Sequence, residues 1–295
     1  MYNNKMRIKV LDVVILIALA LLAIFIVYRL TTQLNYKWNW GILPNYFFYY
    51  EDETGHWVAN ILTQGLLTTI RLSIWATLVA AVIGVITGLM RISDRLFWRL
   101  VGRSYVELIR NMPPLVLVFI FYFFVSSQIL PLFGVDDFIR SCSADTQKLL
   151  AYFFAKPSLF TAFISGTLSI ALFQGAYITE IVRAGIQSIE KGQWEAGNAL
   201  GLTWLQQMRW VIMPQALKRV LPPLTNEFIN TIKYSAIVSV ISIQELTFQG
   251  TQIMASTYVT IEVWVTITAI YLVMCFSLSM CVRRLEIYLK RNEGI

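Results

Sequence analysis

Five polar side chains interrupt apolar stretches of this sequence and are the best candidates to contact a polar solute. They are Gln174, Glu180, Asn226, Asn230 and Lys233. The last three are spaced i, i+4 and i+7, so a helix would carry them on one face. Polar and charged groups are costly in lipid and therefore face a bundle interior or a cavity. Two interpretations stay open: these residues line a pathway, or they satisfy one another, as Glu180 and Arg183 could at spacing i, i+3.

A second candidate is the segment 185–224, which is too apolar for a solvated linker and too interrupted for a membrane span. It predicts a short helix over about 193–200 that ends at Gly201. A second helix begins with the capping pattern Thr203-x-x-Gln206, and we expect Pro214 to bend or end it. Small residues near an exposed helix end let another protein approach the backbone. The segment therefore predicts a docking site, against the alternative of a surface loop without a partner.

Enzymatic chemistry is disfavoured by what the sequence lacks. His56 is the single histidine, and the G-x-x-x-x-G-K-S/T pattern of a nucleotide-binding loop is absent. The three cysteines, Cys142, Cys275 and Cys281, suggest no disulfide framework. Paired catalytic carboxylates do not emerge either. We therefore expect no catalytic residue, metal or cofactor on this chain, so any ATP is hydrolysed elsewhere.

Membrane helices must position these residues. The chain has 295 residues, of which 57% are hydrophobic and 14% charged, and its mean hydropathy is +0.62. Soluble domains carry about 25% charged residues, so much of this surface faces lipid. A span needs about 20 mainly apolar residues. The predicted spans are Val13–Val27, Leu72–Met90, Met112–Gly134, Pro157–Thr179, about 226–245, and Val263–Val282. The fifth is the weakest, because it contains Glu227 and Lys233.

The basic residues predict the orientation of these spans. The expected inner segments hold 17 Lys and Arg residues, whereas the expected outer segments hold 4. The inner segments are 1–10, 91–110, 183–224 and 283–295, and the outer segments are 31–57, 132–158 and 246–261. The positive-inside rule then places both termini in the cytoplasm. It also accounts for the net charge of +7 without nucleic acid.

Three surface features remain. The first apolar stretch could be a signal peptide, but no cleavage pattern follows it, so we interpret it as an uncleaved anchor. The aromatic segment Trp38–Trp57 is typical of an outer interfacial belt. Arg95, Arg99 and Arg103 follow one helical stripe, which indicates either contact with anionic lipid or a regulatory partner, or ordinary snorkelling at the inner surface.

The docking segment carries a recognisable motif. Glu195-Ala196-Gly197, then Gly201 after three residues, then Val211–Pro214 after nine, resembles the E-A-A-x3-G-x9-I-x-L-P motif of ABC importer permeases. The runs Glu180–Ala196, Pro214–Leu217 and Leu221–Phe228, with Ser239-Val240, are similar to the polar amino-acid uptake branch, the His/Glu/Gln/Arg/opine permeases. The resemblance covers about residues 57–290. The third motif position is Gly197 rather than alanine, which weakens the helix by up to about 1 kcal/mol. Val211 and Met213 are milder departures from the motif.

The resemblance implies an all-α, polytopic membrane protein with a five-helix permease core starting near Gly65. One extra transmembrane helix precedes this core. Residues 1–56 would form an N-terminal tail, anchor and periplasmic aromatic-rich loop, and 57–295 the permease domain with a cytoplasmic coupling loop over about 185–224. The motif positions that would contact the ATPase are Glu195, Ala196, Gly197, Ala199, Gly201 and Pro214.

The resemblance also implies partners. ATP and Mg would be bound by a separate ATP-binding cassette ATPase dimer, and substrate would come from a periplasmic substrate-binding protein. A second permease subunit, identical or a paralogue, completes the pathway for a polar amino acid in the lipid of a bacterial inner membrane. A standalone channel or secondary transporter is the alternative, although neither has a use for the docking motif. A membrane enzyme is a third possibility, disfavoured by the single histidine. The sequence does not identify the amino acid carried, nor the role of the outer segment 132–157.

Overall fold

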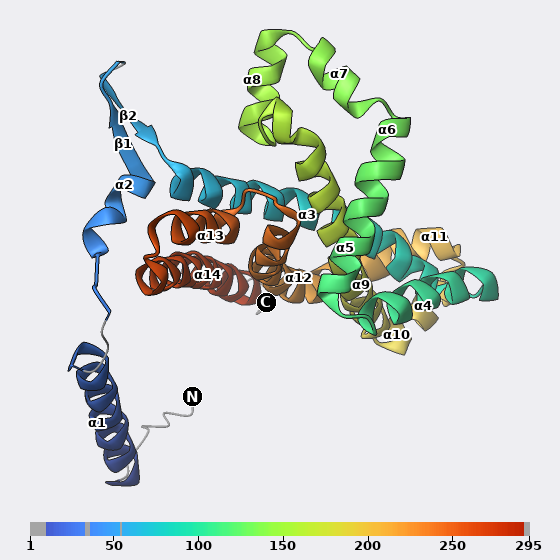
Figure 1. The fold of residues 1–295 in the computed structure, drawn as a ribbon. Helices are drawn as coiled ribbons and strands as arrows, with labels where there is room; N and C mark the ends of the chain where they lie inside the picture. The colour runs from blue at the N-terminus through green and yellow to red at the C-terminus, as the bar shows by residue number, and fades with distance from the viewer. Residues whose placement is uncertain (1–9, 33–35, 54, 292–295) are drawn as a thin grey trace. The chain divides into compact units, whose positions relative to one another are not determined.

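The computed structural model describes residues 10–32, 36–53 and 55–291, which are predominantly helical (Figure 1). The chain divides into two compact units, Met1–Trp40 and Gly41–Ile295. In the first unit, α1 (Val10–Thr32) contains the predicted N-terminal span, and its described side chains are largely exposed, as expected of a helix whose solvent is lipid. The extra helix before the core is thus confirmed.

The remaining elements follow in chain order. They are η1 (Trp40–Ile42), α2 (Pro44–Phe47), β1 (Phe48–Glu51), β2 (His56–Ala59), α3 (Ile61–Ile92), α4 (Leu96–Arg110), α5 (Pro114–Phe124), η2 (Val125–Ile129), α6 (Leu130–Leu132), α7 (Val135–Ser141), α8 (Ala144–Phe153), η3 (Pro157–Leu159), α9 (Phe160–Gln187), α10 (Lys191–Ala199), α11 (Trp204–Gln207), η4 (Met208–Ile212), α12 (Met213–Tyr234), η5 (Ser235–Ile241), α13 (Leu246–Thr257) and α14 (Thr260–Arg291).

Four helical stretches in the described residues are long and apolar enough to cross a membrane. They are Ile61–Ile92, Pro114–Leu132, Pro157–Gln187 and Thr260–Arg284, which match four predicted spans. The helices α3 and α9 pack closely along their length. Small residues permit this approach: a Cβ added at Gly88 would lie 2.8 Å from Val182 Cγ1. The pairing of α3 with α9 fixes the positions of Gln174 and Glu180.

The helix at the fifth predicted span differs from the prediction. Instead of spanning about 226–245, α12 begins at Met213 and ends at Tyr234, and a 3-10 segment follows to Ile241. The helix contains Pro222 and Pro223, which sequence reasoning treated as part of the preceding loop. The Thr225 hydroxyl donates a 2.7 Å hydrogen bond to the Pro222 carbonyl. Membrane helices tolerate proline where neighbouring groups satisfy the carbonyls that lose an N–H partner.

Several expected outer segments are more ordered than predicted. Part of the aromatic segment forms an antiparallel hairpin in which Tyr50 pairs with Trp57. The segment 132–158 contains α7 and α8, which link α6 to α9 (Figure 1). The predicted loop 246–261 is also largely helical, because the Glu245 carboxylate caps α13 by accepting a 2.8 Å bond from the Phe248 amide. The sequence predicted no secondary structure in these outer segments, and the structure supplies it.

Candidate functional site

The docking segment folds much as its local signals predict. The short helix α10 ends before Gly201, which adopts a left-handed conformation with φ of +68°. The Leu202 amide donates to the Gly197 carbonyl at 3.1 Å, and the Gly201 amide donates to the Asn198 carbonyl at 2.9 Å. These paired bonds form a Schellman motif, which favours glycine at the left-handed position. The predicted helix and its glycine stop are confirmed.

The next helix begins at the predicted capping box. The Gln206 amide donates to Thr203 Oγ1 at 3.4 Å, and the Thr203 amide donates to Gln206 Oε1 at 2.9 Å. Pro214 does not end this segment: the chain stays helical from Trp204 through a π-helical turn, η4, into α12. Pro214 lies in the first turn of α12. Of the two expectations, a bend or an end, the structure excludes the end; the regular helical pattern is instead interrupted by the π-helical turn just before Pro214.

The motif residues divide between two faces of α10. Glu195, Ala196 and Ala199 are exposed, and Gly197 is buried. A Cβ added at Gly197 would lie 2.5 Å from Gln207 Nε2, and Gln207 in turn donates to the Trp194 carbonyl. Gly197 therefore faces its own fold. The sequence interpretation grouped it with the residues open to a partner, and in this respect the structure corrects it.

The tip of the docking segment presents an apolar surface. Nothing lies within 4 Å of a Cβ added at Gly201. Leu200, Leu205 and Trp210 have 77%, 68% and 69% of their surface exposed. Large exposed apolar side chains so close in sequence are typical of a protein–protein contact.

This tip is tied firmly to the membrane helices behind it. The Arg219 guanidinium on α12 donates to the Ser188 carbonyl, at the end of α9. Gln215 Nε2 donates to Gln193 Oε1 at 3.0 Å, which joins α12 to α10. These bonds connect α10 to the start of α12, and α12 to the end of α9.

The polar row on α12 lies against α9. Gln174 Nε2 donates to Thr231 Oγ1 at 2.9 Å and lies within hydrogen-bonding reach of the Glu227 carboxylate. Among the described residues, the buried Gln174 Oε1 finds no partner. The Asn230 amide donates to Glu227 Oε2 at 3.4 Å, and Lys233 Nζ donates to Asn230 Oδ1 at 3.4 Å. Asn226 and Lys233 are exposed. The structure thus brings Gln174, Asn230 and Lys233 into one polar row.

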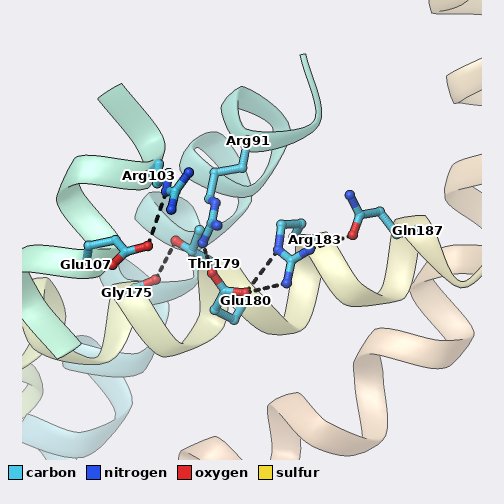
Figure 2. Close-up of polar contacts among 8 residues, drawn as sticks. All are labelled: Arg91, Arg103, Glu107, Gly175, Thr179, Glu180, Arg183 and Gln187. Carbon is cyan, nitrogen blue, oxygen red and sulfur yellow. Dashed lines mark hydrogen bonds and ion pairs between the residues drawn. The ribbon is translucent and has the colours of Figure 1, made fainter. Parts of the chain in front are cut away.

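Glu180 is separated from that row and lies in an ion-pair cluster (Figure 2). Its carboxylate accepts bonds of 2.9 and 2.7 Å from Arg183 and forms a further ion pair with Arg91 at the end of α3. The i, i+3 pairing with Arg183 is therefore present. Glu180 joins the ends of α3 and α9, and its geometry favours this mutual satisfaction over a pathway role.

A cavity of about 230 Å³ lies among α3, α9 and the start of α13. Arg71 and Lys156 line it together with Gln64, Gln244 and Gln249. These residues come from three separate parts of the chain, so no sequence spacing could have united them. In the predicted orientation the cavity lies toward the outer side.

Similarity to known proteins indicates the function of these sites. Residues 80–290 match the family described as "Binding-protein-dependent transport system inner membrane component". This chain belongs to that family. It is a multi-pass membrane permease subunit rather than an enzyme, and the expected ABC importer fold is confirmed. The family match and the ABC permease relatives reported next favour this importer fold over the alternative of a standalone channel or secondary transporter.

Curated relatives of the permease agree with the family match. The probable glutamine ABC transporter permease protein GlnM of Bacillus subtilis is 34% identical over 79% of this chain and 95% of its own length. The glutamate/aspartate import permease protein GltJ of Escherichia coli is 33% identical over 74% of this chain and 80% of its own length. The expected membership in the polar amino-acid branch is confirmed.

Solved structures show the same fold. A chain from a crystal structure of an amino acid ABC transporter with histidines is 35% identical, has a TM-score of 0.60, and is matched over 77% of this permease and 92% of its own length. A chain of the MetNI methionine ABC transporter, 17% identical with a TM-score of 0.57 over 78% of this permease and 96% of its own length, supports the fold alone.

Two structural residues of the permease escaped sequence reasoning. Glu227 was noted only as a charge that weakens a span, although it accepts a bond from Asn230 on α12 and lies within hydrogen-bonding reach of Gln174 on α9. Gln207 could not be identified from the sequence, because its role is to pack against Gly197, ten residues earlier, and to bond the Trp194 carbonyl. In the described residues no cluster of three His, Cys, Asp or Glu side chains is placed to hold a metal ion.

We expect Gly197→Ala to loosen the docking segment. The added methyl group must push Gln207 away from the Trp194 carbonyl, which costs about 1–3 kcal/mol. Amide hydrogen exchange across α10 should accelerate accordingly. The double variant Gly197→Ala/Gln207→Ala makes room for the methyl group and should recover part of the protection; no difference between single and double variants would contradict the packing argument.

We expect Glu180→Gln to lower the free energy of unfolding in detergent by about 2 kcal/mol, because two partly buried arginines lose their shared counter-charge. Glu107→Gln is the matched control, since its bond to Arg103 is solvent-exposed and worth about 0–1 kcal/mol. Denaturant titration of the purified permease measures both changes. Equal losses in the two variants would show that the Glu180 cluster contributes no more to the free energy of unfolding than the exposed Arg103–Glu107 pair.

Proposed function

We propose that this permease imports a polar amino acid and that its α10–α11 turn couples the movement to ATP hydrolysis on a partner. The observation that carries the proposal is the open Gly201 tip with its exposed apolar neighbours, placed at the ABC permease motif. ATP and Mg would be bound by an ATP-binding cassette ATPase dimer, and this chain would hold no cofactor. Glu195, Ala196, Ala199 and Gly201 would contact the ATPase, while Gly197 and Pro214 shape the segment.

The link from α10 to α12 supports the transmission of force. Closure of the ATPase pair would push the α10 tip, and the Gln193–Gln215 and Ser188–Arg219 bonds would pass this push to α9 and α12. Those two helices carry the polar row. Docking and pathway are therefore joined by a short run of hydrogen bonds, which suits a device that opens alternately to the two sides.

A second permease subunit, whether identical or a paralogue, would complete the pathway. Asn226 and Lys233 are exposed on α12, a core helix of a membrane protein. A lysine facing hydrocarbon would be costly, so this face requires a neighbouring subunit or a water-filled cavity. Asn226, Asn230 and Lys233 would then line the pathway with Gln174. Glu180 would remain structural.

The transported amino acid would be of the glutamine or glutamate class. Relatives of the permease are named for glutamine and for glutamate/aspartate transport. Such substrates carry an ammonium, a carboxylate and a further polar group, and the α12 row offers both donors and acceptors. A periplasmic substrate-binding protein would deliver the amino acid, and both termini would lie in the cytoplasm of a bacterial cell.

A mild-detergent pull-down of the full chain tests the proposal. We expect an ATP-binding cassette ATPase to accompany it, together with a second permease subunit. Cells that express the complex should take up labelled glutamine, and excess unlabelled glutamate, but not leucine, should compete. Absence of any ATPase under conditions that keep membrane complexes together would overturn the coupling role. Competition by leucine alone would overturn the substrate class.

A further inference from the structure

The arginine row of α4 has no part in the proposed transport. In the structure α4 is an amphipathic helix that packs against the end of α3 and against α9. Gly102 allows this close approach, since a Cβ there would lie 2.8 Å from Arg91 Cγ. The arginines of α4 are thereby brought beside those of α3 and α9.

Two cavities of about 340 and 350 Å³ lie at this junction, and both are lined by Arg91 and Glu107. The charged residues lining the pair are Arg91, Arg99, Arg103, Arg110, Arg183, Glu107 and Glu180. Five arginines against two glutamates leave a net charge of +3 at this junction.

The two carboxylates are already shared. Glu180 bonds both Arg91 and Arg183, and Glu107 accepts a 3.2 Å bond from Arg103 (Figure 2). Arg103, Arg110 and Arg183 lie near enough to Arg91 to repel its charge. An anion with several oxygens would relieve this repulsion, and guanidinium groups match phosphate oxygens in geometry.

Apolar residues beside these arginines indicate that the ligand also has an apolar part. Leu96 and Leu100 line one cavity, and they are 58% and 50% exposed. They lie between the arginine row and the exposed apolar row of Phe97, Val101 and Leu108. The junction lies at the end of two apolar spans, Ile61–Ile92 and Pro157–Gln187. A ligand here meets positive charge on one side and an apolar surface continuous with the lipid-facing helices on the other.

We propose that this junction binds the headgroup of an anionic phospholipid. The phosphate would lie among Arg91, Arg99 and Arg103, and the acyl chains would follow Leu96 and Leu100 toward the lipid-facing surface. The charge complementarity and the apolar lining select a lipid over a soluble anion. In the predicted orientation the site belongs to the inner leaflet.

Native mass spectrometry of the full chain in a neutral detergent tests this site, with phosphatidylglycerol or phosphatidylcholine as the added lipid. We expect the chain to retain phosphatidylglycerol at least about tenfold more tightly than phosphatidylcholine. Arg99→Gln/Arg103→Gln should reduce that preference by about tenfold, because each basic residue near the membrane surface strengthens the attraction to anionic lipid several-fold. Arg283→Gln/Arg284→Gln removes two exposed charges from α14, outside the cavities, and should change it by less than about twofold.

Three results would overturn the assignment. If both double variants lose the preference for phosphatidylglycerol equally, the preference comes from general surface charge and not from this site. Equal retention of the two lipids would remove the selectivity. Displacement of phosphatidylglycerol by inorganic phosphate would show that the site takes a free anion. If the α4 double variant fails to fold, Leu100→Glu places a carboxylate at an exposed cavity position and should weaken phosphatidylglycerol retention; unchanged retention would contradict the proposal.

Discussion

The variant Gly201→Trp is expected to lose its ATPase in a mild-detergent pull-down and to lower amino-acid uptake by more than about tenfold, while the chain still inserts into the membrane. Nothing lies within 4 Å of a Cβ added at Gly201, so the base of the new side chain meets no part of the permease itself. It would instead occupy the space that a docked partner needs. The left-handed backbone at φ +68° adds strain of about 1–2 kcal/mol for most side chains with a Cβ, tryptophan included.

Two controls separate bulk from backbone strain. Gly134→Trp places the same side chain at another open glycine with φ +58°, between α6 and α7, and should leave ATPase binding intact. Gly201→Asn keeps a residue that tolerates the left-handed region and should retain most of the association. If Gly201→Trp still brings down the ATPase and supports uptake at the native rate, the coupling surface does not include the tip.

The docking segment was predictable because its signals are local. The glycine stop and the capping box each act within about six residues, and both reappear in the hydrogen bonds of α10 and α11. The apolar spans were predictable for a similar reason, since each backbone group in lipid must find its partner within its own helix.

The contacts that join distant segments were not predictable. Arg91 and Glu180 are separated by an entire span and meet only because α3 and α9 pack together. From the sequence, Gly197 is only a departure that weakens the motif helix. In the structure, Gln207 occupies the space that a side chain at this position would need. The extent of α12 was also missed, because two adjacent prolines usually mark a helix end, whereas a membrane helix can retain them.

Substitution of Lys233, in the polar row of α12, is expected to have a large effect on transport. We expect Lys233→Ala to lower uptake by about tenfold or more and to change the preference between neutral and acidic substrates. Lys233 is exposed, so its removal leaves the packing of the single chain intact. It also removes the one cation of the row, and a hydrogen bond to a charged group is worth about 1.5–3 kcal/mol. Uptake of labelled glutamine and glutamate at equal protein level measures both changes.

The matched control is Lys218→Ala, which removes an exposed lysine from the same helix four turns earlier, toward the docking segment. It should change neither the rate nor the substrate preference by more than about twofold. The partner ATPase distinguishes pathway from coupling: Lys233→Ala should keep ATP hydrolysis while uptake falls, since α10 and its bonds to α12 are untouched. Unchanged uptake and selectivity would place Lys233 outside the pathway, and a parallel loss of hydrolysis would assign it to coupling instead.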